Sequence, residues 1–423
     1  MSDLTPSPAG SLAGLVVVDL SRVLAGPYAG QLLGDHGADV IKVEPPGGDT
    51  TREWGPADEE RISPYYAGLN RNKRHISLDL SAAGGRATLL ALLAEADVLI
   101  ENFLAGTMER WGIPTEWILE RFPRLIYCRI SAFGTSGAMA GLPGYDAVLQ
   151  AYSGLMELNG EPAGRPIRTP VPITDLTAGM HAFSGILLAL HERHASNRGQ
   201  LVDISLLDSA LSLQHPTAAN YFATGTAPRR LGSGHPNVAP CNVFESSGDL
   251  IYVAAGTDRQ FRILCEYLGR PELADDGRFV TNPDRLAHVE ELQEALAAGL
   301  SEMTITADTA KEMIALGIPA SIVRRLEDVL ADPQVVERDM TPTVGRFRVV
   351  GVPAKLSRTP GSIRTPPRAL GEDSVSVAAD LGLSTEVIDA LLRSGALISS
   401  QARDSTSSSA HPVSDPAHHR PRV

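Results

Sequence analysis

Three glycines follow the first apolar run of the sequence, where nucleotide-binding enzymes carry a phosphate-binding turn. Gly26, Gly30 and Gly34 are spaced four residues apart. The dinucleotide fingerprint G-x-G-x-x-G has a different spacing, and its middle glycine lets the backbone touch a pyrophosphate. A four-residue spacing instead places the three glycines on one face of a helix, where they favour close packing against a strand. The pattern favours packing, with a nicotinamide or flavin site as the alternative.

Polar residues also end two of the apolar runs. Glu44 ends the run "DVIKVE", where a carboxylate binds a ribose hydroxyl in dinucleotide enzymes, although "EPPGGD" is equally typical of a plain turn. Asn102 and Phe103 follow the run "DVLIE". Ligands bind at the carboxyl ends of strands in open α/β sheets, so these two residues are candidates for ligand contact. Phe103 alternatively belongs to the core.

A compact basic run and one acidic residue complete the candidates. The run "NRNKRH" contains Arg71, Lys73 and Arg74, which either bind an anionic ligand or form a solvated surface loop. Asp175 lies where the extended run "PVPIT" gives way to an apolar helix, a position typical of an N-cap. The helix dipole favours the anion there, so we expect this carboxylate to stay ionised.

The elements that must position these residues alternate between short β-branched runs and helical patterns. This alternation predicts an α/β fold, and the apolar density of the runs predicts a mostly parallel sheet buried on both faces. Strands are predicted at 15–20, 39–44, 97–102, 125–133, 200–206 and 250–256, and helices at 82–94, 177–193, 259–268 and around "STEVIDALLRSGALI".

Changes in composition and residue pattern along the chain predict its domain boundaries. We expect a large Rossmann-like domain at 12–208, a linker with a glycine loop at 209–238, and a smaller α+β domain at 239–330. A segment at 331–398 is expected to return to the large domain. The Ser-, His- and Pro-rich tail at 399–423 is expected to be disordered.

Bulk composition excludes several classes of protein. The net charge of −13 argues against a nucleic-acid or anionic-membrane surface. The three cysteines form no CxxC pair, so neither a disulfide framework nor a zinc site is indicated. The N-terminal sequence lacks the pattern of a signal peptide, and no run is uninterrupted and apolar over the roughly 18 residues that a membrane span needs. We expect a cytoplasmic enzyme without a metal.

Several longer motifs, taken in order, resemble one known family. They are "LAGPYAGQLLGDHGADVIKVEPPGGDTTR", "NRNKRHISLDL", "ADVLIENFLAGTMERWGI", "LIYCRISAFGTSGA", "GYDAVLQAYSGLM", "PVPITDLTAGMHAFSGILLALHERHASNRGQLVDISLLDSAL" and "GHPNVAPCNVF". Together they closely resemble the family III CoA-transferases, a group that includes 2-methylacyl-CoA racemase as a relative. The resemblance runs from about Leu12 to Ile398 and implies an interlocked homodimer.

The resemblance also implies a reaction and its residues. Asp175 matches the family's catalytic aspartate, which takes CoA from an acyl-CoA as an aspartyl-CoA thioester and passes it to a carboxylic acid. No bound cofactor is implied, because the CoA thioester is itself the substrate. The residues implied to contact CoA are Asn72, Lys73, Arg74, Asn102, Phe103 and Arg110, and the loop implied to cover the intermediate is Gly232, Ser233 and Gly234.

Departures from the family narrow the activity. Formyl-CoA transferase has glutamine where this chain has Leu24 and arginine where it has Pro45, which argues against oxalate–formate exchange. The racemase relatives have histidine at the position of Tyr145, and a tyrosine with a pKa of about 10 is a poor base at neutral pH. A CoA-transferase is therefore preferred, with a racemase and a non-catalytic CoA-binding protein as the alternatives.

Overall fold

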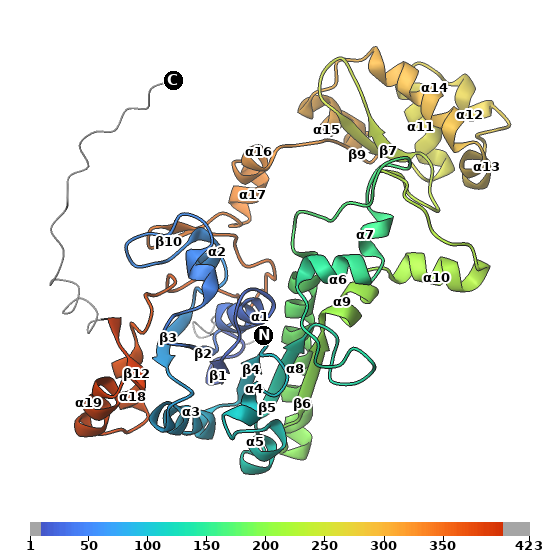
Figure 1. The fold of residues 1–423 in the computed structure, drawn as a ribbon. Helices are drawn as coiled ribbons and strands as arrows, with labels where there is room; N and C mark the ends of the chain where they lie inside the picture. Colours follow the sequence, from blue (N-terminus) through green and yellow to red (C-terminus); the bar gives the residue numbers. More distant parts are fainter. Residues whose placement is uncertain (1–9, 401–423) are drawn as a thin grey trace, which may run out of the picture. The chain divides into compact units, whose positions relative to one another are not determined.

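Seven strands form one sheet in the computed structural model, which describes residues 10–400 (Figure 1). Their order is β12-β3-β2-β1-β4-β5-β6, and every neighbouring pair is parallel except β12 with β3. The strands are β1 (Val16–Asp19), β2 (Asp39–Glu44), β3 (Lys73–Leu78), β4 (Val98–Glu101), β5 (Ile126–Ser131), β6 (Leu201–Ser205) and β12 (Leu397–Ile398). The prediction of an α/β fold with a mostly parallel sheet is confirmed.

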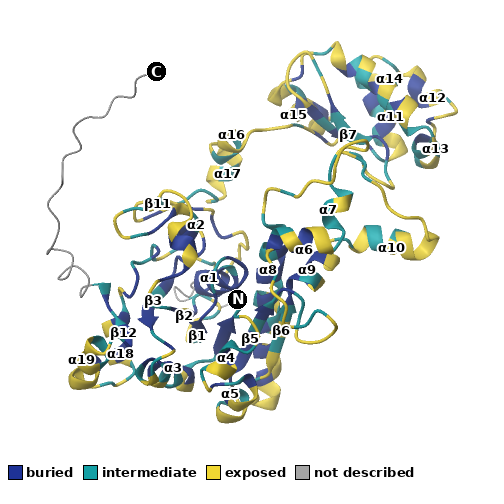
Figure 2. Ribbon diagram, viewed as in Figure 1, coloured by how far each residue is buried: buried dark blue, intermediate teal, exposed yellow. Residues whose placement is uncertain are grey.

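Helices cover both faces of this sheet. Adjacent residues Val17 and Val18 of β1 point into different cores, which is the alternation expected of a strand buried on both sides. The first core packs against α1 (Ala25–Asp35), α8 (Ile173–Ser196) and α9 (Leu206–Ser212). The second packs against α3 (Ala83–Glu95), α4 (Thr107–Arg110), α5 (Thr115–Arg121), α18 (Ser374–Asp380) and α19 (Thr385–Arg393). Figure 2 shows the central strands as buried and the outer helix faces as exposed.

The three spaced glycines lie in α1, and their predicted packing role is confirmed. A Cβ at Gly30 would lie 2.8 Å from Asp19 Oδ2, and one at Gly34 would lie 3.0 Å from the Asn72 carbonyl oxygen. Gly26 leaves equally little room, because a Cβ there would lie 2.3 Å from Ser21 Oγ. The glycines therefore let α1 approach the turn after β1 and the start of β3, and no dinucleotide turn is formed.

The basic run forms the start of β3, so the interpretation of this run as a solvated surface loop is wrong. Lys73 and His75 are 1% and 0% exposed. The sequence does not predict a strand here, because charged side chains are seldom fully buried without a partner. Here each buried charge of the run has a partner inside the protein, as described below.

The chain divides into two compact units. The first contains the sheet and comprises residues 10–149, 172–213 and 339–400 of the described part. The second comprises residues 150–171 and 214–338, so it also takes in a segment that the sequence analysis assigned to the large domain. The predicted tail lies, from residue 401 onward, outside the described residues.

A three-stranded antiparallel sheet forms the centre of the second unit. Its strands are β7 (Cys241–Phe244), β8 (Ile251–Ala254) and β9 (Ala320–Ile322), with β8 in the middle. The helices of this unit are α7 (Leu155–Leu158), α10 (His215–Thr224), α11 (Asp258–Tyr267), α12 (Glu272–Asp275), α13 (Asn282–Ala287), α14 (Val289–Ser301), α15 (Ala307–Ala315), α16 (Leu326–Leu330) and α17 (Pro333–Glu337). α6 (Asp146–Tyr152) crosses the boundary between the units.

The C-terminal segment completes the first unit. Residues 339–400 supply the short hairpin β10 (Thr343–Val344) and β11 (Phe347–Arg348), then α18, α19 and the edge strand β12. Two short elements lie nearer the N-terminus of the same unit, η1 (Thr50–Glu53) and α2 (Pro64–Ala67).

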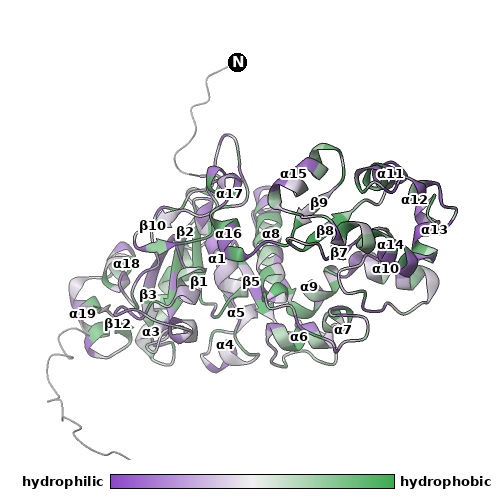
Figure 3. Ribbon diagram, turned by 90° about the horizontal axis from the view of Figure 1, so that it is seen from above, coloured by the Kyte–Doolittle hydropathy of each residue, from purple (hydrophilic) through white to green (hydrophobic). Residues whose placement is uncertain are grey.

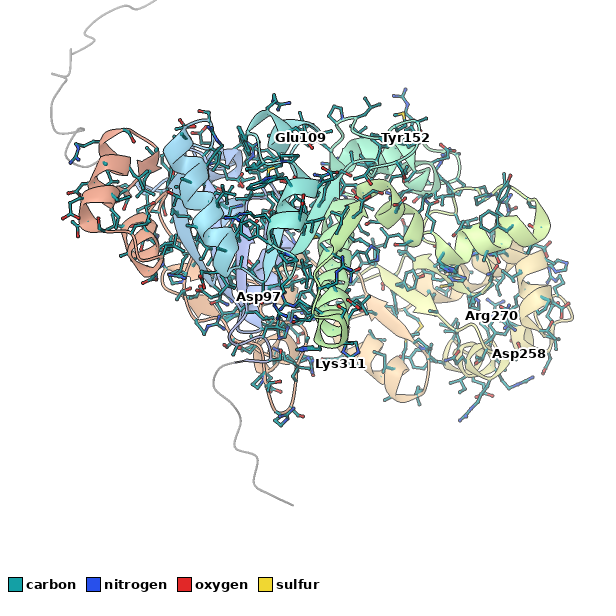
Figure 4. All side chains as sticks on the ribbon, turned by 90° about the horizontal axis from the view of Figure 1, so that it is seen from below. Asp97, Glu109, Tyr152, Asp258, Arg270 and Lys311 are labelled. Atoms are coloured by element: carbon teal, nitrogen blue, oxygen red, sulfur yellow. The ribbon has the colours of Figure 1, made fainter. Side chains whose placement is uncertain are left out.

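α8 packs along one face of the sheet. Among the described residues it is the one helix long and apolar enough to cross a membrane by length and composition. A core helix meets the same criteria, and α8 packs against α1, α9, β5 and β6. At its C-terminal end, Arg193 Nη2 donates to Asp97 Oδ1 at 2.8 Å, and Nη1 donates to the Arg124 carbonyl at 3.0 Å (Figure 4 labels Asp97). These contacts fix the helix against the amino ends of β4 and β5.

Buried charges connect β1, β2 and β3 in the interior of the first unit. Asp19, Lys42 and Lys73 have fully buried side chains. Lys73 Nζ lies 2.9 Å from Asp19 Oδ2, and Lys42 Nζ lies 4.0 Å from the same oxygen. Burial alone would raise the pKa of Asp19, but the two ammonium groups outweigh it and lower this pKa. Burial lowers the pKa of Lys73 to about 8, against the opposing effect of Asp19.

Replacing Asp19 by asparagine tests how far the fold depends on this cluster. The substitution leaves two buried ammonium groups without their shared anion, so we expect a loss of about 3–5 kcal/mol in the free energy of unfolding. Asp380→Asn is the matched control, because the Asp380–Arg74 pair spans 2.7 Å with the Asp380 side chain 66% exposed, and exposed pairs contribute at most about 1 kcal/mol. Denaturant unfolding of both variants makes the comparison. Equal midpoints for the two variants would contradict the prediction.

Candidate active site

The strand order reverses direction at β1, whose neighbours are β2 on one side and β4 on the other. Ligands of open α/β proteins bind at such a point, outside the carboxyl ends of the strands. The turn from β1 to α1 occupies this position. It contains Val23, a β-branched residue at φ +70°, a conformation that costs free energy and persists only where the surroundings hold it.

Side chains from neighbouring strands and loops hold the backbone of this turn. The Asn102 amide forms two hydrogen bonds with Arg22, accepting from its N–H at 2.8 Å and donating to its carbonyl at 2.7 Å. Asp49 Oδ2 accepts from the Val23 N–H at 3.2 Å. Lys42 Nζ donates to the carbonyl of Ser21, the residue before Arg22. The strained conformation is therefore held by Asn102 and by the buried side chains of Asp49 and Lys42.

A cavity of about 150 Å³ lies at the carboxyl ends of β1 to β4. Phe103 and Trp111 pack edge to face in its wall, with ring centroids 5.1 Å apart. The guanidinium carbon of Arg22 lies 5.5 Å from the centroid of the Phe103 ring. No ion pair to Arg22 occurs among residues 10–400. The other lining residues are Leu20, Val43, Glu44, Pro45, Pro46, Leu78, Asp79, Leu80 and Ser81. Aromatic side chains beside a guanidinium group that has no ion pair favour the binding of a planar, anionic ligand.

The residues predicted near Asn102 lie in three different situations. Phe103 lines the cavity. Asn102 uses its amide to hold the Arg22 backbone, so it positions the turn. Arg110 is exposed and donates to Thr107 Oγ1 at 2.7 Å. Whether each contacts CoA stays a prediction.

The predicted CoA-contacting residues of β3 and the loop before it have internal partners. Lys73 donates to Asp19, to the Asn70 side chain at 2.9 Å and to the Pro27 carbonyl at 2.8 Å. The Asn72 amide donates to Asp35 Oδ1 at 2.7 Å. Arg74, half-buried, donates to Asp39 and Asp380. Their charges and polar groups are thus already engaged, and a role in CoA binding stays a prediction for these three.

Glu44 also has internal partners, and a role of its carboxylate as a ribose ligand stays a prediction. Arg52 binds both of its oxygens, through Nε at 2.8 Å and Nη2 at 2.7 Å. The Tyr66 hydroxyl donates to Oε1 at 2.8 Å. Burial would raise the pKa of Glu44, but Arg52 and His75 outweigh it and hold this pKa well below its usual range.

Asp175 is the third residue of α8, and Pro172 is the N-cap. The N-cap interpretation of Asp175 is therefore wrong, although its carboxylate belongs to the first helical turn. α8 leads into β6, which is parallel to β5, so α8 begins at the carboxyl edge of the sheet. One turn further along the same face, a Cβ at Gly179 would lie 2.7 Å from the Ala25 carbonyl oxygen. Asp175 thus lies above the start of α1, on the side of the strained turn.

Two groups from other elements lie close to Asp175. Asp146, the first residue of α6, is 7% exposed and accepts a hydrogen bond from the Thr174 N–H at 2.9 Å. Burial, then the charge of Asp146, raises the pKa of Asp175 to about 7. Burial, then the charges of Asp175, Asp146 and Asp49, raises the pKa of Tyr65 to about 12.

The raised pKa corrects the expectation that the helix dipole keeps Asp175 fully ionised. A helix N-terminus stabilises an anion by about 0.3–1 kcal/mol at exposed positions. Burial and a neighbouring carboxylate act in the opposite direction and outweigh that effect here. The carboxylate is therefore more basic than an ordinary aspartate.

The predicted glycine loop belongs to the second unit. Gly232 has φ +58°, and its N–H donates to the Gly160 carbonyl at 3.1 Å. The Ser233 carbonyl accepts from the Tyr252 hydroxyl at 3.3 Å. These bonds hold the loop to its own unit, and its covering role over an intermediate stays a prediction.

Sequence reasoning missed Arg22, Tyr65 and Asp146. Arg22 directly follows the first strand and a serine, which is the position of a ligand-binding turn, so its location was the available signal. Asp146 lies in the motif "GYDAV", directly after the tyrosine that occupies the position of the racemase histidine. That tyrosine, Tyr145, is 71% exposed. Within residues 10–400, no group of three or more His, Cys, Asp or Glu side chains is arranged to hold a metal ion.

Comparisons with known proteins agree with this architecture. The family model for CoA-transferase family III matches residues 12–374. The succinate–glutarate CoA-transferase of Agrobacterium fabrum is 39% identical over 394 residues, covering 90% of this chain and 98% of that protein. The acetyl-CoA:oxalate CoA-transferase of Acetobacter aceti is 39% identical over 360 residues, covering 84% of this chain and 92% of that protein.

A solved structure extends the similarity to three dimensions. A CAIB/BAIF family protein from Brucella suis has a TM-score of 0.80 and 37% identity, and the match covers 88% of this chain and 100% of that one. Family, sequence relatives and fold agree over nearly the whole described length. The chain therefore belongs to family III of the CoA-transferases.

Proposed function

We propose that this enzyme carries CoA between carboxylic acids as a thioester on Asp175. The observation that carries the proposal is the place of Asp175 in the first turn of α8, at the carboxyl edge of the sheet and beside the buried Asp146. Burial and the charge of Asp146 raise its pKa, and a carboxylate of raised basicity is a better nucleophile.

The proposed cycle balances without any further reactant. A carboxylate oxygen of Asp175 attacks the donor thioester carbonyl, the C–S bond breaks, and CoA leaves as thiolate from a mixed anhydride. The thiolate then attacks the Asp175 side-chain carbonyl and releases the donor acid. The acceptor carboxylate attacks the resulting aspartyl thioester and forms a second anhydride, from which the thiolate takes the acceptor acyl group. Asp175 returns as a carboxylate, so no bound cofactor or metal is required.

Trapping tests the covalent step. In the presence of an acyl-CoA donor and hydroxylamine, we expect a hydroxamate at Asp175, located by peptide mass spectrometry. Asp175→Asn should lose the label and about 10³-fold or more of the exchange rate, because removing a covalent nucleophile abolishes both half-reactions.

Asp208→Asn is the control for this experiment, because Asp208 is an exposed aspartate in the first turn of α9. It should label and turn over like the unsubstituted enzyme. Full exchange activity in Asp175→Asn would overturn the proposal. Deuterium entry at the substrate α-carbon without CoA exchange would favour the racemase.

We further propose that the nucleotide end of CoA occupies the cavity at the carboxyl ends of β1 to β4. Phe103 and Trp111 offer aromatic faces for the adenine, and the Arg22 guanidinium is available for a phosphate. Asn102 supports this indirectly, because its two hydrogen bonds fix the backbone of Arg22.

Arg22→Met tests the cavity. Loss of a charge-assisted hydrogen bond worth about 1.5–3 kcal/mol corresponds to a rise of roughly 10- to 150-fold in the KM for acyl-CoA. The KM for the acceptor acid should stay unchanged in steady-state kinetics. Arg121→Met, an exposed arginine at the end of α5, is the control. Equal acyl-CoA KM values in the two variants would exclude Arg22 as a ligand.

The acid substrates belong to the proposal as well. The names of several relatives specify short dicarboxylic acids: succinate and glutarate, oxalate, and mesaconate. We propose a short dicarboxylate as acceptor and the CoA thioester of a second short carboxylic acid, such as succinyl-CoA, as donor. Leu24 and Pro45 argue against oxalate–formate exchange, as the sequence predicts.

We propose a homodimer, supported by apolar side chains that α8 and α9 leave exposed. Leu188 is 71% exposed, Leu211 50% and Met180 46%. Only 44% of the most apolar window of α8 is buried, and Figure 3 shows hydrophobic residues along this helix. Apolar surface on this scale is typical of a partner interface.

Sedimentation measures the assembly. We expect a mass of twice 44.9 kDa for the unsubstituted chain, and dissociation or loss of assembly for Leu188→Glu combined with Leu211→Glu, because two buried charges would oppose the interface. Val350→Glu, at a residue 64% exposed in the first unit, is the control and should remain dimeric. A monomeric unsubstituted enzyme would contradict the proposal.

A further inference from the structure

A second buried carboxylate lies beside the nucleophile and has a defined structural partner. Asp146 Oδ1 accepts from the Thr174 N–H at 2.9 Å and from Thr174 Oγ1 at 2.5 Å. Thr174 directly precedes Asp175 and is itself fully buried. Both bonds end on one oxygen of Asp146, so α6 is tied to the first turn of α8 at the residue next to the nucleophile.

These bonds change the environment of Asp175 in two ways. The Thr174 N–H is one of the unpaired donors at the start of α8, and a carboxylate from another helix now takes it. The negative charge that accepts this donor lies close enough to act on Asp175. Among the described residues, no hydrogen bond or ion pair is found at the Asp175 carboxylate itself. The nucleophile is therefore next to an anion and lacks a cation of its own.

We propose that Asp146 is a positioning residue that fixes Asp175 through Thr174 and, by its charge, keeps the nucleophile reactive. The inference rests on the proposed thioester at Asp175. An anion beside a carboxylate makes that carboxylate more basic and destabilises its ionised form relative to a neutral acyl derivative. The aspartyl thioester is such a neutral derivative, so the charge of Asp146 favours forming it and disfavours retention of the released acid anion.

The other groups that face Asp175 do not supply this effect. Tyr65 of α2 is neutral at working pH, because its pKa lies at about 12. Asp49, before η1, is committed to Lys42 at 3.6 Å and to the Val23 and Thr51 N–H groups. Asp146 is thus the charged neighbour that acts on Asp175 from outside α8.

The pH profile of kcat/KM tests the proposal with Asp146→Asn. Asparagine retains an acceptor oxygen for Thr174 and removes the charge. In the unsubstituted enzyme, activity should rise as pH increases through about 7, because Asp175 must lose its proton to attack. In Asp146→Asn this rise should occur at lower pH, with a several-fold lower rate on the plateau because the carboxylate is less basic.

A second variant separates charge from position. Asp146→Glu keeps the charge and displaces the acceptor, so the rise should stay near the unsubstituted pH while the rate falls. Asp208→Asn is the control and should change neither quantity. Thermal unfolding of each variant verifies folding. If Asp146→Asn does not fold, an acid limb in Asp146→Glu that moves to lower pH would by itself contradict the proposal.

The outcomes for this inference and for the thioester mechanism differ. An acid limb at the same pH in Asp146→Asn and the unsubstituted enzyme overturns the role of Asp146, provided that hydroxylamine still labels Asp175 in both. Absence of label in the unsubstituted enzyme overturns the thioester itself, whatever the pH profiles show.

Discussion

The ion cluster of Asp19, Lys42 and Lys73 is the constraint on which the rest of the first unit depends. It connects three adjacent parallel strands, and each side chain is fully buried. Buried charges of this kind are tolerated only when their partners are complete. Lys42 also donates to the Ser21 carbonyl and lies beside Asp49, so the cluster extends into the turn after β1. Its rigidity is what lets a valine remain at positive φ there.

From this cluster, the position of Asp175, the proposed nucleophile, follows through helix packing. α1 begins where the strained turn ends, and Gly179 lets α8 approach the first residue of α1 within backbone contact. Arg193 holds the opposite end of α8 against β4 and β5. A helix fixed at its far end and packed closely along α1 leaves its first turn little freedom to move. Asp175 is therefore held to a definite place by contacts remote from the chemistry.

Local patterns were sufficient for elements whose partners are near in sequence. The apolar runs and the four-residue glycine spacing predicted six strands and the packing face of α1, because strand burial and helix periodicity act over a few residues. They did not find the buried partners of Lys73, Glu44 and Asp146. A buried charged side chain looks like a surface or ligand residue until its partner is known, and the partners here, Asp19, Arg52 and Thr174, are between 8 and 54 positions away in sequence.

The contrast between two acidic centres supports the proposal that Asp175 is the one that reacts. Glu44 lies as deep as Asp19, and a bidentate arginine holds its carboxylate as a stable, weakly basic anion. The carboxylate of Asp175 is half-buried and lies beside a second carboxylate, and no ion pair to it occurs among residues 10–400. Thioester exchange between similar acids is nearly balanced in free energy, so the reaction needs no strong driving force. It needs a carboxylate whose neutral acyl form is not much less stable than its anion. A fold provides such a carboxylate most directly by leaving it without a positively charged partner.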